Sequence, residues 1–116
     1  MRIIADARQW TICGEAENGL GGVQQFADLK PDLAIIDLAL PDMNGLQAAK
    51  RMSSLDRTVP LFLFTVTDVK GLQSAARKAG ISQVVSKFHI WDLIRRVENT
   101  STPHRGLGLE AIEVSA

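Results

Sequence analysis

The chain has 116 residues, a length typical of one domain, and 46% of them are hydrophobic, which suffices for one core and argues against disorder. Thirteen basic residues balance thirteen acidic ones, so no net charge draws the chain toward nucleic acid or anionic lipid. The single cysteine excludes an internal disulfide, no apolar run approaches the ~20 residues of a membrane helix, and the N-terminus is too polar for a secretory signal; these features predict a cytoplasmic, single-domain protein.

Strand-like and helix-like patterns alternate along the chain. Short apolar or β-branched runs predict strands, and longer segments with one apolar stripe predict helices. In chain order we expect a strand at 10–16, a helix at 20–30, a strand at 33–37, a helix at 45–55, a strand at 60–65, a helix at 68–80, a strand at 82–87 and a helix at 90–98. The runs LAIID (33–37) and PLFLFT (60–65) are typical of strands that are covered on both faces.

This alternation indicates βαβ units, and therefore a three-layer α/β fold with a mostly parallel sheet. In such sheets ligands bind at the carboxyl ends of the strands, where Asp37, Thr65 and Lys87 each close a strand. A carboxylate, a hydroxyl and an ammonium that converge suit phosphoryl chemistry, because the carboxylate can form an acyl phosphate while the other two bind its oxygens. Taken singly, each also has a structural interpretation, as a loop cap, a β-preferring residue and a solvated charge.

The order of these residues resembles the receiver domain of bacterial two-component response regulators. The resemblance runs from about Trp10 to Glu98 and rests on the segments GEAENG (14–19), PDLAIIDLALPDMNGL (31–46), FLFT (62–65), AG (79–80) and VSK (85–87). It implies a flavodoxin-like fold and a signalling module rather than an enzyme.

The resemblance also assigns roles to the residues at the strand ends. Asp37 would accept a phosphoryl group from a histidine kinase or a phosphotransfer protein. Thr65 would be the switch hydroxyl and Lys87 the lysine of the family. The backbone carbonyl of Ala39 would face a Mg²⁺ ion beside Asp37.

The N-terminus departs from this family, whose members begin with a strand that ends in two acidic Mg²⁺ ligands, followed by a helix. Only nine residues precede Trp10. Either residues 2–9 are the last part of that helix and the acidic strand is absent, or residues 1–7 are the strand, with Asp6 at its end, and the helix is missing. A parallel crossover needs a dozen or more residues, which favours the first interpretation. We therefore expect an incomplete first strand–helix unit and weak or lost Mg²⁺ binding.

The switch region departs as well. Val84 stands three residues before Lys87, where the family usually has an aromatic residue, and Val66 follows Thr65, where a small residue is usual. We expect phosphorylation to signal by protein contacts rather than through rotation of an aromatic ring. The alternative is a degenerate receiver that binds proteins independently of phosphorylation.

The last residues carry weaker signals. We expect residues 1–98 to form the receiver-like domain and residues 99–116 a C-terminal tail. Within the tail, LEAIEV (109–114) can form a helical turn or an edge strand that uses the vacant position in the sheet, and disorder is the expected state. No helix-turn-helix is visible, so we expect no direct binding of nucleic acid. The sequence does not decide whether the chain forms a homodimer, or whether it is a fragment of a larger DNA-binding regulator. Cys13 is expected to be a small core residue.

Overall fold

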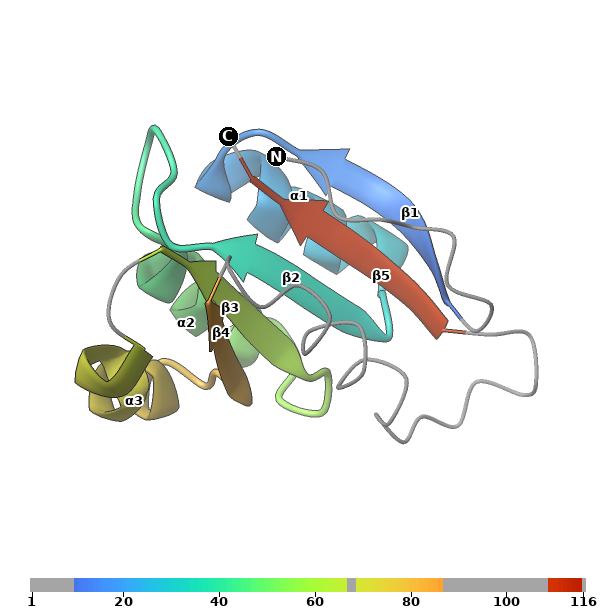
Figure 1. Ribbon diagram of the computed structural model, residues 1–116. Helices are drawn as coiled ribbons and strands as arrows, with labels where there is room; N and C mark the ends of the chain where they lie inside the picture. The colour runs from blue at the N-terminus through green and yellow to red at the C-terminus, as the bar shows by residue number, and fades with distance from the viewer. Residues whose placement is uncertain (1–9, 67–68, 87–108, 116) are drawn as a thin grey trace.

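The computed structural model describes residues 10–66, 69–86 and 109–115, which form a five-stranded parallel sheet flanked by helices (Figure 1). The elements are β1 (Trp10–Ala16), α1 (Gly19–Leu29), β2 (Leu33–Asp37), α2 (Gly45–Leu55), β3 (Leu61–Thr65), α3 (Val69–Lys78), β4 (Gln83–Ser86) and β5 (Leu109–Val114). The predicted α/β fold with a parallel sheet is confirmed. Lys87, the helix expected at 90–98 and both interpretations of residues 1–9 lie outside the described residues.

The C-terminal strand occupies a central place in the sheet. The strand order is β1-β5-β2-β3-β4, and β5 runs parallel to both of its neighbours. The expectation that residues 109–114 are disordered is therefore wrong, and so is the alternative of a helical turn. The segment does form a strand that uses the vacant position in the sheet, but as a central strand and not as an edge strand. It fills the position that the first strand holds in the flavodoxin-like order 2-1-3-4-5. The position between β1 and β2 is thus held by β5.

Both faces of the inner strands are buried. On one face, alternate residues such as Ile36, Leu63 and Val114 pack in one cluster with Phe26 of α1 and Met52 of α2. The residues between them point to the opposite face and are also buried: Leu33, Ile35, Phe62, Phe64 and Ala111. In Figure 1, α1 and α2 lie behind the sheet and α3 lies near β4. Burial on both faces explains why β2 and β3 are continuous apolar runs, as the sequence predicts.

The helices begin and end where local chemistry requires it. The side chain of Asn18 caps α1 by accepting a hydrogen bond from the backbone N–H of Gly21 at 2.7 Å. Asn44 and Gln47 form a reciprocal capping box at the start of α2. The Asn44-Gly45 pair therefore begins a helix. Gly80 adopts a φ of 91°, as expected of the glycine that ends α3.

Among the described strands, β1 lies at the edge of the sheet and pairs with β5 alone. Its residues Thr11, Cys13 and Glu15 are exposed. The prediction that Cys13 is a core residue is therefore wrong.

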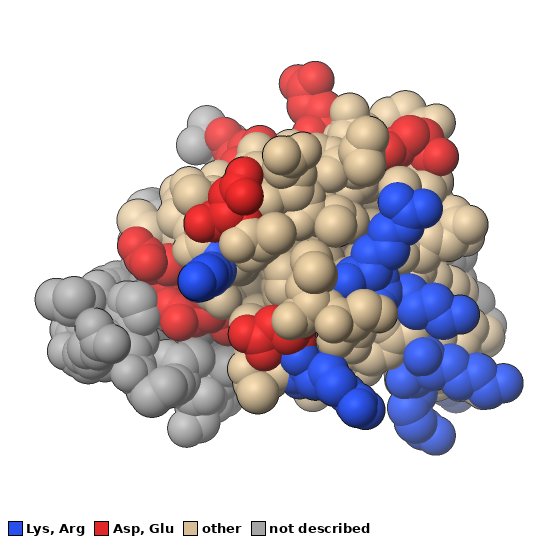
Figure 2. Space-filling model, turned by 180° about the vertical axis from the view of Figure 1, so that it is seen from behind, with Lys and Arg blue, Asp and Glu red and all other residues tan. Residues whose placement is uncertain are grey.

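Charge is distributed unevenly over the described surface, although the net charge of the chain is zero. Figure 2 shows most of the Lys and Arg side chains toward the right and lower right of this face, whereas Asp and Glu side chains are spread over its top, left and lower centre. Exposed basic residues come from α2, the turn after it and α3: Lys50, Arg51, Arg57, Lys70, Arg77 and Lys78. Among the described helices, none combines the length and the apolar character that crossing a bilayer requires.

Candidate functional site

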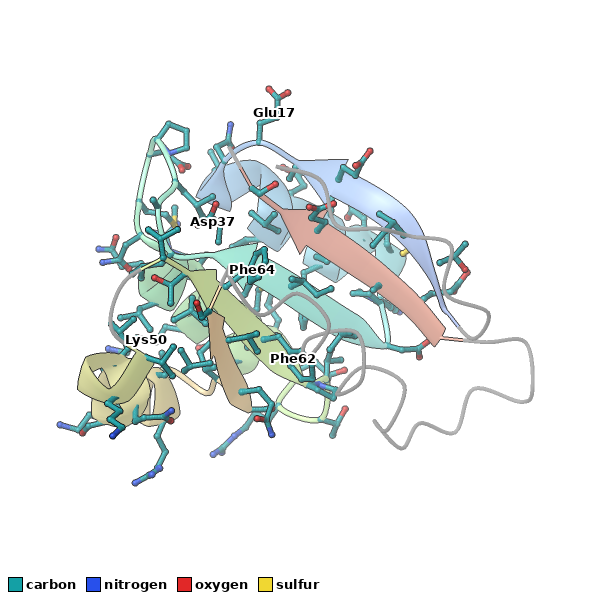
Figure 3. All side chains as sticks on the ribbon, viewed as in Figure 1. Glu17, Asp37, Lys50, Phe62 and Phe64 are labelled. Atoms are coloured by element: carbon teal, nitrogen blue, oxygen red, sulfur yellow. The ribbon has the colours of Figure 1, made fainter. Side chains whose placement is uncertain are left out.

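Asp37 is the last residue of β2, and its side chain is only 5% exposed at the carboxyl edge of the sheet. Its Oδ1 accepts a hydrogen bond from the backbone N–H of Ala39 at 3.1 Å. A bond to the residue two positions ahead forms an Asx turn, so the chain turns directly after the strand. Figure 3 shows Asp37 near Phe64 of β3, with which it is paired in register. The turn therefore holds this carboxylate in one orientation.

Backbone hydrogen bonds fix the loop after Asp37 at both of its ends. The N–H of Leu38 donates to the carbonyl oxygen of Phe64 at 2.9 Å, and the N–H of Gly45 donates to the carbonyl oxygen of Leu38 at 2.8 Å. A Cβ on Gly45 would overlap the carbonyl oxygen of Asp37 and would approach Leu63 Cδ1 to 2.9 Å. Only glycine allows α2 to start this close to the end of β2.

A second carboxylate of the loop, Asp42, ties it to α1. Its Oδ1 accepts from the N–H of Gly19 at 2.7 Å and its Oδ2 from the N–H of Leu20 at 2.9 Å. These bonds, that of Gly19 first, lower the pKa of Asp42. Donors at a helix N-terminus favour an anion. This positioning role was missed from the sequence, although an aspartate after Pro41 and a helix start at Asn18 are its signals.

Thr65 ends β3 and is 1% exposed. Phe64 is level with Asp37, so Thr65 lies one residue further along the adjacent strand. Thr65 is also paired in register with Ser86, the last residue of β4. The structure therefore brings Asp37 and Thr65 to the same edge of adjacent strands. Lys87 follows Ser86 in the sequence but lies outside the described residues.

No carboxylate of β5 stands level with Asp37. Val114 pairs with Ile36, so Ser115 falls beside Asp37, whereas Glu113 is paired with Ile35 lower in the sheet and is 3% exposed. Figure 3 shows Glu17, just beyond β1, pointing away from Asp37. Within the described ranges no group of three or more His, Cys, Asp or Glu side chains could hold a metal ion.

The described oxygen atoms near Asp37 are too few to bind Mg²⁺ by themselves. Mg²⁺ needs near-octahedral oxygen ligands and usually more than a single carboxylate. Among the described residues, Asp37 places a carboxylate at this edge, and the carbonyl of Ala39 stays a predicted ligand. They do not make a complete Mg²⁺ site, because Val114 and Ser115 end the strand that takes the place of the acidic one.

The two valines of the switch region lie in different environments. Val84 is buried and packs in the core cluster, whereas Val66, next to Thr65, is 60% exposed. The buried place three residues before Lys87 is thus filled by a branched aliphatic side chain that has no ring to rotate.

Comparisons with known proteins identify response regulators and their receiver domains. The family profile described as the response regulator receiver domain matches residues 1–98. The chain is 40% identical over 37 residues to the chemotaxis protein CheY of Thermotoga maritima, covering 32% of this chain and 31% of that protein. It is 44% identical over 45 residues to the nitrate/nitrite response regulator protein NarL of Escherichia coli K12, covering 39% and 21%. The chain thus spans less than a third of these relatives.

Among solved structures, the response regulator domain of Thermotoga maritima CheB superimposes with a TM-score of 0.69 at 20% identity, covering 79% of each chain. A LuxR-family response regulator from Aurantimonas sp. gives a TM-score of 0.66 at 23% identity, covering 70% of this chain and 59% of that one. At these identities the likeness establishes the receiver fold alone.

Proposed function

The chain belongs to the response regulator receiver domain family, and from that premise we propose that Asp37 is its phosphoacceptor. The observation that carries the proposal is the carboxylate at the carboxyl edge of β2, oriented by the N–H of Ala39, with Thr65 closing the adjacent strand. In the transfer, a carboxylate oxygen of Asp37 attacks the phosphorus of a phosphohistidine. The N–P bond breaks, an O–P bond forms, and the donor is left with a free histidine. The donor is a histidine kinase or a phosphotransfer protein.

Thr65 and Lys87 are proposed to serve the phosphorylated state. A hydroxyl one residue beyond the level of Asp37 can donate a hydrogen bond to a phosphoryl oxygen, and a lysine can offset the added negative charge. Receiver domains are signalling modules rather than enzymes. Phosphorylation of Asp37 would therefore produce a more negatively charged surface to which partner proteins bind. We expect the chain to act in the cytoplasm.

Phosphorylation is expected to be slow. Receiver domains typically bind Mg²⁺ at the phosphorylation site, and the donors around Asp37 do not complete such a site. We propose that Mg²⁺ binding is weak or lost in this chain. Loss of one well-placed ligand removes several kcal/mol of charge stabilisation, and about 1.4 kcal/mol corresponds to a tenfold change in rate. Labelling should therefore be orders of magnitude slower than in receivers with an acidic pair.

The test is the intact mass of the chain after incubation with acetyl phosphate and MgCl₂. Asp37→Asn should abolish the added phosphoryl mass, because the amide is a nearly isosteric but poor nucleophile. Asp56→Asn is the matched control, since Asp56 is exposed and binds Thr58 in the turn after α2. Equal labelling of the wild type and of Asp37→Asn would refute the proposal.

The second candidate is a degenerate receiver that binds partners without phosphorylation. The observation that favours it is Val114-Ser115 at the place of the acidic pair. A partner protein that binds the wild type and Asp37→Asn with equal affinity, with no labelling of the wild type, would select this candidate. A further candidate is a piece of a larger DNA-binding regulator, and its support is that the match covers only 21% of the relative NarL. Direct binding of nucleic acid by residues 1–116 is not expected.

A further inference from the structure

Strand β5 is what joins β1 to the other described strands. β1 pairs with β5 alone, whereas β2 pairs with β5 on one side and with β3 on the other. Without β5, the two edges of β1 and β2 would face each other across the width of one strand, each presenting a row of backbone donors and acceptors. We call this place between β1 and β2 the strand slot.

The strand slot selects side chains by their size and chemical character on each face of the inserted strand. Ile112 and Val114 are fully buried on the face where α1 packs, and Ala111 is fully buried on the opposite face. Gly22 of α1 leaves the room that Val114 fills, since a Cβ there would lie 2.6 and 2.8 Å from the two methyl groups of Val114. The slot therefore fits an extended segment with branched apolar residues at positions 112 and 114 on one face, and a small residue at 111 and the buried Glu113 on the other face.

Both ends of the bound strand are fastened. The carboxylate Oδ2 of Asp32 accepts from the N–H of Glu110 at 2.9 Å, and the N–H of Asp32 donates to the carbonyl oxygen of Glu110 at 2.7 Å. At the other end, the N–H of Ser115 donates to the carbonyl oxygen of Ala16 at 2.9 Å. These bonds fix the register, because a shift by one residue would turn the apolar side chains to the wrong face.

We propose that the strand slot also binds the C-terminal strand of a second copy of the chain, so that two copies exchange β5 and form a symmetric dimer. β5 follows β4 through residues 87–108, and ~22 residues can reach up to about 70 Å when extended. The longest dimension of the molecule is 35 Å. The segment is therefore long enough to place β5 in the slot of a neighbouring copy.

The exchanged and the unexchanged arrangements contain the same contacts. Every hydrogen bond and buried side chain of β5 recurs when the strand comes from another copy, so the two forms differ mainly in the freedom of the connecting segment. A flexible linker of about this length would give an effective concentration on the order of 1 mM. Monomers should prevail at micromolar concentration, and exchanged dimers should accumulate as the chain concentration approaches the millimolar range.

The experiment uses two full-length chains that both carry Cys13→Ser. One chain carries Thr11→Cys and the other Glu110→Cys, because these residues are paired in register across β1 and β5 and are both exposed. Neighbouring strands are about 4.8 Å apart, which lies within the Cα separation of a disulfide. The two chains are mixed, unfolded, refolded together at micromolar and at roughly 1 mM concentration, and oxidised.

A disulfide between the two chains, increasing with concentration, is the expected result. A single chain that carries both cysteines should close internally at micromolar concentration. Val114→Asp in the Glu110→Cys chain should prevent the linkage between chains, whereas Ser115→Ala should preserve it, since its backbone N–H remains. Internal closure without any linkage between chains near millimolar concentration would overturn the proposal, as would a dimer in which oxidation leaves the Thr11→Cys and Glu110→Cys chains unlinked. The test involves no phosphate, so its failure is separate from that of Asp37 phosphorylation.

Discussion

Replacing Gly45 by alanine probes how closely α2 is set against the end of β2. The new Cβ would overlap the carbonyl oxygen of Asp37 and lie 2.9 Å from Cδ1 of the fully buried Leu63. Overpacking of this kind costs about 1–3 kcal/mol. The higher helix propensity of alanine offsets at most about 1 kcal/mol of that loss. We expect the free energy of unfolding to fall by about 1–2 kcal/mol.

Urea unfolding followed by circular dichroism measures this change, with an unchanged m-value as the sign that the native fold persists. Gly21→Ala is the matched control, because its Cβ would lie 3.0 Å from Asn18 Oδ1 and in ordinary contact with Ala16 Cβ at 3.6 Å, without overlapping any backbone atom. It should stay within about 1 kcal/mol of the wild type. Acetyl phosphate labelling of Asp37 should also decrease in Gly45→Ala alone. If both variants unfold at the same urea concentration as the wild type, the close approach of α2 to Asp37 is refuted.

Three further predictions concern other parts of the molecule. Ile112→Ala should lower the unfolding free energy by about 2–5 kcal/mol in urea, since Ile112 is fully buried; a loss below about 0.5 kcal/mol would contradict the central place of β5. The lowered pKa of Asp42 means that its contribution to stability is complete above its ordinary pKa of 3.8 and is lost as the pH falls through the folded-state value; the urea midpoint of Asp42→Asn should lack this acid-dependent decrease. Partial burial first, and the charge of Glu110 second, raise the pKa of the Cys13 thiol, so iodoacetamide should alkylate it more slowly at pH 8 than free cysteine, and Glu110→Gln should speed the reaction.

Much of the fold could be predicted because the signals are local. LAIID and LFLFT are continuous apolar runs since β2 and β3 are buried on both faces, and Gly80 ends α3 through a backbone conformation that glycine favours. The edge where Asp37 and Thr65 meet follows from the rule that ligands bind at the carboxyl ends of parallel strands.

The place of β5 could not be predicted, because it depends on contacts far apart in the sequence. Leu109–Val114 carries two glutamates and follows a polar segment, so nothing local marks it as a central strand. Its partners are distant, as the bond between Glu110 and Asp32 shows across 78 positions. The exposure of Cys13 was missed for the same reason, since only the strand order reveals that β1 lies at an edge.

The most direct test of the central claim is the position of the acyl phosphate. The chain is incubated with acetyl phosphate and MgCl₂, the product is trapped by borohydride reduction, and the modified residue is mapped by peptide mass spectrometry. We predict modification of Asp37 alone. Modification of Asp32 or Asp42 with Asp37 untouched would contradict the assignment, because it would place the reactive carboxylate away from the end of β2.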